Sequence, residues 1–381
     1  MAPDPAVDRR FMRSALALAA RGLGRTWPNP AVGCVIVAAA ADGAMRPIGR
    51  GWTQPGGRPH AETEALGRAR ALAGAAGLAG ATAYVTLEPC SHHGRTPPCA
   101  DALIEAGIRR VVVACGDPDR RVAGAGVARL RAAGLIVDEG LCESEARALN
   151  GGFLLTRSSG RPLVTLKLAA SLDGRIATAS GKSQWITGER ARARAHLMRA
   201  RHDAVMVGGG TALADDPQLD CRLPGMADRP PVAVVVDGRL AALSPASRLA
   251  AAARQRKVWV LTTPHAAADR ADALVATGIE VIRCTPDGER HVAMAGALEA
   301  LAGRGVTRVL VEGGAGMAAA LLREGLVDRL AWFRAPTLLG GDGLAAIEGL
   351  GVDSPGEAPR FVLSDREMVG DDLLETFERV A

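Results

Sequence analysis

Short apolar runs alternate with helical patterns along most of this chain, and that alternation restricts its fold more than any other feature. Apolar runs of about four to eight residues bounded by glycine or proline are typical of buried strands. The first half has such runs at 32–37, 81–87, 109–115 and 135–138. Helical patterns cover 11–22, 61–76, 99–107 and 124–134. This alternation predicts an α/β fold, in which helices cover both faces of a mostly parallel sheet.

A second α/β domain is expected after residue 150. The helical pattern that begins at Glu143 is expected to end at Asn150-Gly151-Gly152, and residues 157–162 are polar and rich in turn formers. The sequence therefore predicts two domains, 1–150 and 151–381. Strands of the second domain are expected at 163–170, 203–207, 232–236, 257–261, 279–282, 307–311 and 328–334. Its helices are expected at 188–201, 289–302 and 315–324.

Charge and cysteine content exclude several classes of protein. The net charge is +5, but its arginines are scattered and only 3% of the residues are aromatic, so no nucleic-acid surface is predicted. The charge fits a small phosphorylated ligand better. No apolar run reaches the roughly 18 residues of a membrane helix, and the N-terminus lacks a signal-peptide layout, so we expect a cytoplasmic protein. Seven cysteines argue against a disulfide scaffold and leave metal binding open.

His60, Cys90 and Cys99 form a pattern typical of a catalytic zinc site. His60 and Glu62 open a predicted helix, Cys90 follows the strand that ends at Leu87, and Cys99 opens the next helix. One imidazole and two thiolates give a tetrahedral zinc three ligands and leave the fourth position to water. The Glu62 carboxylate can carry a proton from that water to departing ammonia, which is the chemistry of hydrolytic deamination.

Two alternatives to a catalytic zinc stay open for this pattern. The Pro-Cys pair can be a buried turn without a metal, or the zinc can be structural, with His92 or His93 as its fourth ligand. The order of the elements, the carboxylate beside the expected water and the polar turn around Asn29 favour catalysis.

Three segments resemble the deaminase domain of the bifunctional riboflavin-biosynthesis deaminase–reductases. They are T-W-P-N-P-A-V-G-C at 26–34, P-H-A-E-T-E-A-L at 59–66 and V-T-L-E-P-C-S-H-H-G-R-T-P-P-C at 85–99. The resemblance implies a cytidine-deaminase-like three-layer α/β/α fold, with zinc on His60, Cys90 and Cys99. It further implies that Glu62 is the proton shuttle and that Asn29 and His92 contact the pyrimidine.

Glycine clusters mark the second half, most clearly Val311-Glu312-Gly313-Gly314-Ala315-Gly316 between a strand and a helix. Small residues there let backbone N–H groups approach a phosphate, although tight-turn packing accounts for them equally well. The G-x-G-x-x-G fingerprint is absent, so a Rossmann domain is not supported. The segments 167–177, 183–187, 208–217 and 311–316, taken together and in this order, resemble the reductase domain of the same family. This resemblance implies a dihydrofolate-reductase-like α/β fold and NADPH as cofactor.

The same resemblance implies two sets of binding residues in the second half. The NADP site would be lined by Ala169, Trp185, Thr211, Asp215, Gly314, Ala315, Gly316, Met317, Ala318, Ala319 and Ala320. The ribosyl-phosphate substrate would be held by Ser183, Arg199, Leu219, Arg222 and Glu312. Arg199 and Arg222 also make chemical sense there, because a guanidinium binds phosphate with two hydrogen bonds. Gly238 stands where some relatives have a hydroxyl residue, so it is left out of the site.

Lys167 and Asp215 are the candidate catalytic residues of the second half. Lys167 leaves the first strand of this domain and Asp215 follows a glycine-rich loop, so both can reach the sugar. We expect Lys167 to deliver or relay a proton and Asp215 to orient ribose and nicotinamide. The alternative is a structural ion pair of Lys167 with Asp215 or Glu312.

The resulting hypothesis is a bifunctional enzyme of riboflavin synthesis. It would deaminate a diaminopyrimidine ribosyl phosphate to the uracil and then reduce the ribosyl group to ribityl with NADPH. Its family resemblance also implies a homo-oligomer. Two rivals are a nucleic-acid or free-base deaminase with an unrelated appended domain, and a zinc-stabilised nucleotide-binding module without turnover.

Overall fold

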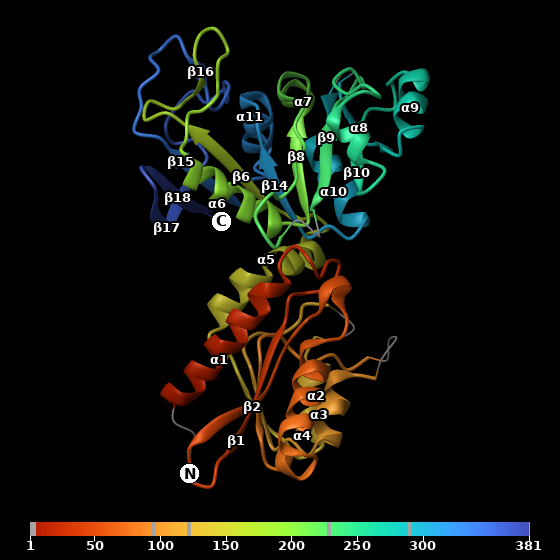
Figure 1. The fold of residues 1–381 in the computed structure, drawn as a ribbon, viewed down its shortest axis with the longest axis vertical. Helices are drawn as coiled ribbons and strands as arrows, with labels where there is room; N and C mark the ends of the chain where they lie inside the picture. The colour runs from red at the N-terminus through yellow and green to blue at the C-terminus, as the bar shows by residue number, and fades with distance from the viewer. Residues whose placement is uncertain (1–4, 93–96, 120–122, 227–229, 289–290, 381) are drawn as a thin grey trace. The chain divides into compact units, whose positions relative to one another are not determined.

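The computed structural model describes residues 5–92, 97–119, 123–226, 230–288 and 291–380. The chain divides into two compact units, Met1–Ser159 and Gly160–Ala381 (Figure 1). This division lies beyond the boundary expected near residue 150, because α5 (Glu143–Ser159) continues through Asn150-Gly151-Gly152 instead of ending there. Asn150 and Gly152 are both buried, so tertiary packing overrides the weak helix propensity of this tripeptide.

The first unit is a five-stranded sheet between two layers of helices (Figure 1). The strand order is β2-β1-β3-β4-β5, formed by β1 (Gly33–Ala39), β2 (Met45–Trp52), β3 (Thr82–Val85), β4 (Arg110–Val113) and β5 (Ile136–Glu139). α1 (Pro5–Ala19) and α5 lie on one face. α2 (Ala61–Ala73), α3 (Cys99–Glu105) and α4 (Ala125–Ala132) lie on the other. The three-layer arrangement expected for the first domain is confirmed.

Strand β2 is missing from the sequence prediction, and the sheet of the first unit is mixed rather than mostly parallel. β1 pairs antiparallel with both β2 and β3, whereas β3, β4 and β5 run parallel. β2 contains a proline and two glycines, which weaken the sequence pattern of a strand. One of these glycines has a packing role, because a Cβ on Gly51 would lie 2.1 Å from the carbonyl oxygen of Ala61 in α2.

The second unit is built on a nine-stranded sheet with the order β11-β10-β9-β8-β14-β6-β15-β18-β17. Its parallel strands are β11 (Glu280–Arg283), β10 (Val258–Thr262), β9 (Val232–Val236), β8 (Ala204–Gly208), β14 (Arg308–Glu312), β6 (Leu163–Ala170) and β15 (Arg329–Arg334). All of them lie at predicted positions. The antiparallel hairpin of β17 (Phe361–Val369) and β18 (Asp372–Arg379) was not predicted, and it extends the sheet beyond β15.

Helices cover both faces of this second sheet (Figure 1). They are α6 (Glu189–Ala200), α7 (Gly209–Asp215), α8 (Arg248–Ala252), α9 (Ala268–Val275), α10 (Met294–Gly303) and α11 (Ala315–Arg323). The sequence predicts α6, α10 and α11, and the Ala-rich stretch 249–253 is typical of the helix found at α8, whereas the short α7 and α9 were not predicted. Two small ribbons pair β7 (Arg175–Ala177) with β16 (Leu344–Ala345) and β12 (Pro286–Asp287) with β13 (His291–Val292). In the part of the chain that the structure describes, no helix is long and apolar enough to cross a membrane.

Candidate active sites

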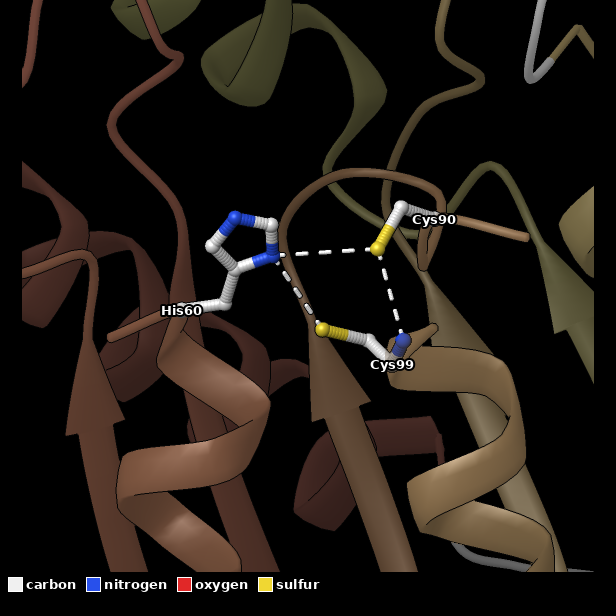
Figure 2. A group of neighbouring side chains, drawn as sticks. All are labelled: His60, Cys90 and Cys99. Atoms are coloured by element: carbon white, nitrogen blue, oxygen red, sulfur yellow. Dashed lines mark hydrogen bonds between the residues drawn. The ribbon is translucent and has the colours of Figure 1, made fainter. Parts of the chain in front are cut away.

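His60, Cys90 and Cys99 converge at one edge of the first sheet (Figure 2). His60 occupies the position just before the first residue of α2, Cys90 lies in the loop after β3, and Cys99 is the first residue of α3. The Nδ1 atom of His60 lies 3.3 Å from Sγ of Cys99 and 3.7 Å from Sγ of Cys90. The backbone N–H of Cys99 donates a hydrogen bond to Sγ of Cys90 at 3.3 Å. Three separate segments of the chain thus present one nitrogen and two sulfur donors to a common point.

These separations fit a tetrahedral zinc ion. Zinc binds imidazole nitrogen and thiolate sulfur at bond lengths that place two ligand atoms of a tetrahedron about 3.6 Å apart. The metal-ligand cluster among the described residues contains His60, Cys90 and Cys99 and no fourth member. A three-ligand set leaves one coordination position to water or substrate, which favours a catalytic over a structural zinc.

Glu62 lies in the first turn of α2 and is only 4% exposed. Burial and the nearby Cys90 raise the pKa of Glu62 to about 7, a value suited to a group that both accepts and releases a proton. Hydrogen bonds from Cys99 and His60 lower the pKa of Cys90 to about 4, so this cysteine is a thiolate that is ready to bind a metal.

Glu88 fixes the loop that carries Cys90, a role that the sequence analysis missed. Its buried carboxylate accepts backbone hydrogen bonds from Asp117 (3.3 Å), Gly124 (3.0 Å), Gly126 (2.9 Å) and Val127 (3.2 Å). Three of these donors stand at the N-terminus of α4, where a negative charge is favoured. The E-P-C motif contains Glu88, but the hydrogen-bond partners of its carboxylate are more than 25 positions away, so the motif alone did not indicate this role.

Asn29 lies beside the segment that leads into the metal centre. A Cβ on Gly57, three residues before His60, would lie 1.9 Å from Nδ2 of Asn29, so the amide occupies the space above this glycine. His92 follows Cys90 by two residues, and its Nδ1 atom is buried without a hydrogen-bond partner among the described residues. His93 lies outside the described residues.

A cavity of about 930 Å³ in the second unit gathers most of the residues predicted there. It opens where β6, β8 and β14 end and α7 and α11 begin. Its lining includes the predicted residues Lys167, Ala169, Ser183, Trp185, Arg199, Thr211, Asp215, Arg222, Glu312, Gly314, Ala315, Gly316 and Met317. The N–H of Gly314 donates a hydrogen bond to Oγ1 of Thr211 at 3.0 Å, which joins the two glycine-rich loops.

Four predicted binding residues are not part of this lining. Leu219 packs in the hydrophobic core beside β8 and β9. Ala318 and Ala319 are fully buried in α11, and Ala320 follows them along the same helix. Consecutive residues of a helix point to different faces, so only the first turn of α11 reaches the cavity. Gly238 also lies outside the lining.

Lys167, Arg199 and Glu312 form a charged cluster in the cavity wall. Arg199 donates two hydrogen bonds to the Glu312 carboxylate, at 2.6 and 3.0 Å, and a third to the carbonyl oxygen of Asp220 at 3.0 Å. Nζ of Lys167 lies 3.9 Å from Oε2 of Glu312. Burial lowers the pKa of Lys167, whereas the Arg199 and Lys167 charges overcome the effect of burial and lower the pKa of Glu312 to about 2.

His196 is a cavity residue that the sequence analysis missed. It lies one turn before Arg199 on α6, and its Nε2 atom is 3.4 Å from Nη2 of Arg222. Burial and the Arg199 and Arg222 charges lower the pKa of His196. The i, i+3 spacing of His196 and Arg199 was the available signal, because such residues share a helix face.

Comparisons with known proteins match both units. The family model of the cytidine and deoxycytidylate deaminase zinc-binding region matches residues 5–115, and that of the RibD C-terminal domain matches residues 162–374. The riboflavin biosynthesis protein RibD of Escherichia coli is 41% identical over 96% of this chain and 98% of its own length. RibD of Bacillus amyloliquefaciens is 39% identical over 96% of this chain and 95% of its own length.

Solved structures agree with these matches. Acinetobacter baumannii RibD superposes with a TM-score of 0.85 at 39% identity and covers 99% of this chain and 100% of its own. A Thermotoga maritima diaminohydroxyphosphoribosylaminopyrimidine deaminase/5-amino-6-(5-phosphoribosylamino)uracil reductase has a TM-score of 0.85 at 35% identity, with 99% of both chains covered.

These matches exclude a deaminase with an unrelated appended domain, because the second unit carries the RibD reductase domain along its length. The chain belongs to the RibD family of riboflavin biosynthesis proteins, and it is an enzyme that combines a zinc-binding deaminase domain with a reductase domain.

Proposed function

We propose that the first unit deaminates 2,5-diamino-6-(5-phosphoribosylamino)pyrimidin-4(3H)-one and that the second reduces the ribosyl group of the resulting uracil to ribityl. The two activities in the name of the Thermotoga maritima relative support these substrates. The observation that carries the proposal is a three-donor metal centre with a buried carboxylate beside it.

In the deaminase site, His60, Cys90 and Cys99 would hold zinc. When bound, zinc supplies a Lewis acid that lowers the pKa of water. Glu62 accepts a proton from the attacking water and delivers it to the amino group that leaves as ammonia, so water enters and ammonia departs. Asn29 and His92 contact the pyrimidine ring and hold its amino-bearing carbon over the centre.

In the reductase site, the cavity binds cofactor and substrate together, and the first turn of α11 receives cofactor phosphate. When bound, NADPH supplies a hydride. The sugar of the N-glycosylamine opens to an imine before C1′ accepts that hydride, and opening needs a proton at the ring oxygen. Lys167 delivers or relays this proton, Glu312 holds Lys167, and Asp215 orients the ribose.

Arg222 is assigned to the substrate phosphate. One edge of the Arg199 guanidinium already donates two hydrogen bonds to Glu312, so Arg199 lines the site and is less available to bind phosphate. Arg222 has a more exposed side chain and lies beside His196 at the same cavity. A guanidinium next to an imidazole is well suited to a phosphate dianion.

The enzyme is further proposed to form a homo-oligomer through β17. This strand is an edge of the nine-stranded sheet and exposes apolar side chains, Met368 at 65% among them. A groove of about 630 Å³ beside it has Trp332, Phe361 and Phe377 among its lining residues, together with charged side chains such as Arg334 and Glu375. Exposed apolar edge strands tend to pair with another chain. Sedimentation should find an oligomer that Met368→Glu weakens, and a monomeric native protein would contradict this assignment.

A cytoplasmic location is proposed from the cysteines. All seven are free thiols, and two of them are the candidate metal ligands Cys90 and Cys99. A reducing compartment keeps such thiols available. Fractionation of cells that express the protein should recover it with the cytoplasmic proteins.

Product analysis tests the substrate assignment. The purified, zinc-loaded protein is given the diaminopyrimidine ribosyl phosphate with and without NADPH, and mass spectrometry identifies the products. Deamination alone is expected without NADPH, and the ribityl uracil is expected with it. No conversion of this substrate, with deamination of cytidine or free bases instead, would contradict the proposal.

A further inference from the structure

The segment just before β1 is held by a side chain from a helix rather than by a neighbouring strand. Asn150, in the middle of α5 and 2% exposed, faces the backbone of Ala31. Its Oδ1 atom accepts a hydrogen bond from the N–H of Ala31 at 3.0 Å, and its Nδ2 group donates to the carbonyl oxygen of Ala31 at 3.1 Å. A partner strand would use the same two backbone groups.

Each of the next two residues also exchanges a pair of hydrogen bonds, in these cases with a threonine that directly follows a strand. Thr53 accepts from the N–H of Val32 at 2.9 Å and donates its own N–H back at 2.9 Å. Thr86 does the same for Gly33, at 3.0 and 3.1 Å. Thr53 follows β2 and Thr86 follows β3, so Asn150 is the anchor that comes from the helical layer.

This anchoring extends to the metal centre through Asn29. Asn29 lies between two prolines, which restrict its backbone, and Pro30 joins it directly to Ala31. Its N–H donates to the carbonyl oxygen of Thr26 at 3.0 Å, and its amide lies against Gly57, ahead of His60. A shift of Ala31 would therefore move Asn29 relative to the donors of the metal centre.

We propose that Asn150 is a positioning residue for deamination, which fixes Ala31 and thereby holds Asn29 in place to contact the pyrimidine. This inference rests on the proposed role of Asn29. Asparagine suits the position because a buried N–H and a buried carbonyl must both be satisfied, and its amide combines an acceptor with a donor. Aspartate keeps the shape but cannot donate, and alanine removes both partners.

The test uses the full-length, zinc-loaded enzyme with single and double substitutions. Asn150→Asp and Asn150→Ala are each expected to lower kcat/KM for deamination about tenfold or more, mainly through a higher KM, with zinc content and reductase activity unchanged. Thr156→Ala is the matched control, because it removes a hydroxyl hydrogen bond to Gly152 within the same helix. This control is expected to leave the KM of deamination unchanged.

A double-mutant cycle separates positioning from general stability. If Asn150 acts through Asn29, the Asn29→Ala/Asn150→Ala double variant should lose little more than Asn29→Ala alone. The inference would be overturned if the fold-loss in kcat/KM of the double variant equalled the product of the two single losses. Normal deamination by both Asn150 variants would also overturn it, and either result would leave the Asn29 contact intact. Normal deamination by Asn29→Ala would refute the pyrimidine contact itself, and the inference would fall with it.

Discussion

Two buried carboxylates, each two residues from a metal-ligand candidate, have different surroundings. Glu88 accepts four backbone hydrogen bonds, so its oxygens are committed to holding the Cys90 loop. Glu62 lies beside the sulfur atoms, and burial raises its pKa to about 7. Of these two carboxylates, Glu62 is therefore the one we propose as the proton shuttle.

Glu62→Gln should abolish most deamination without removing zinc. Glutamine keeps the size of the side chain but cannot accept a proton, and acid–base groups contribute about 10²- to 10⁴-fold to rate. Ammonia release without NADPH measures the activity, and atomic absorption measures the zinc. Near-normal turnover by this variant would rule out the shuttle role.

Lys167→Met should lower kcat of the reductase much more than its affinity for NADPH. The ammonium lies 3.9 Å from Glu312, and methionine keeps the apolar stem while removing the proton donor. A group that acts mainly in the transition state affects kcat. Single-turnover hydride transfer and NADPH titration separate the two quantities. If the variant instead loses only NADPH binding or thermal stability, the lysine is a structural ion-pair member.

The candidate sites were predictable where a short motif sets the geometry. Placing His60 and Glu62 together required only the prediction that a helix begins at residue 61. Placing Cys90 and Cys99 required only the prediction of the strand before Cys90 and of the helix that begins at Cys99. The sequence could not show that Leu219 turns into the core or that His196 faces the cavity, because remote packing decides both. The role of Asn150 was hidden for the same reason, since its partner is 119 positions away.

At the scale of elements, the contact of α2 with β2 places His60 and Glu62. Gly51 of β2 leaves no room for a Cβ, which would lie 2.1 Å from the carbonyl oxygen of Ala61. Ala61 separates His60 from Glu62, so the helix start rests on this strand.

Gly51→Ala should weaken zinc binding and deamination together. The added methyl group must push the start of α2 away from the sheet, because its neighbour is backbone. Gly67→Ala, within α2 itself, is the control, because a Cβ at this position would meet nothing within 4 Å. That change should stabilise the protein by up to about 1 kcal/mol. Equal zinc affinity in both variants, measured by chelator competition, would contradict this account of the helix start.

Elements with strong periodicity were predictable, and those defined by tertiary partners were not. Buried runs such as 203–207 and 307–311 became central parallel strands. β2 contains a proline and two glycines, and the polar run 364–367 interrupts the apolar residues of β17, so neither has the pattern of a buried strand. α5 ran through Asn150-Gly151-Gly152 because this stretch is packed into the first unit.

At the scale of the whole molecule, the first unit needs all of α5. Phe153 belongs to the hydrophobic core of the first unit, beyond the boundary expected near residue 150. A fragment that ends at 150 therefore loses a buried aromatic side chain and the second half of the helix.

A fragment of residues 1–159 should fold and deaminate without NADPH, whereas a fragment of residues 1–150 should be much less stable. Loss of a buried phenylalanine side chain costs about 3 to 5 kcal/mol, comparable to the stability of a small domain. Thermal unfolding and ammonia release compare the two fragments. Equal stability, or NADPH consumption during deamination by the longer fragment, would contradict this division of the chain.

The two units of this chain carry separate proposed sites, with the metal confined to the first. Cys90→Ser tests this separation most directly, in the full-length protein, with zinc content, deamination and reduction of the deaminated substrate measured on one preparation. We expect this variant to lose about one zinc per chain together with deamination, while reduction is unchanged. Retention of zinc by the variant, or loss of both activities in a folded protein, would contradict this expectation.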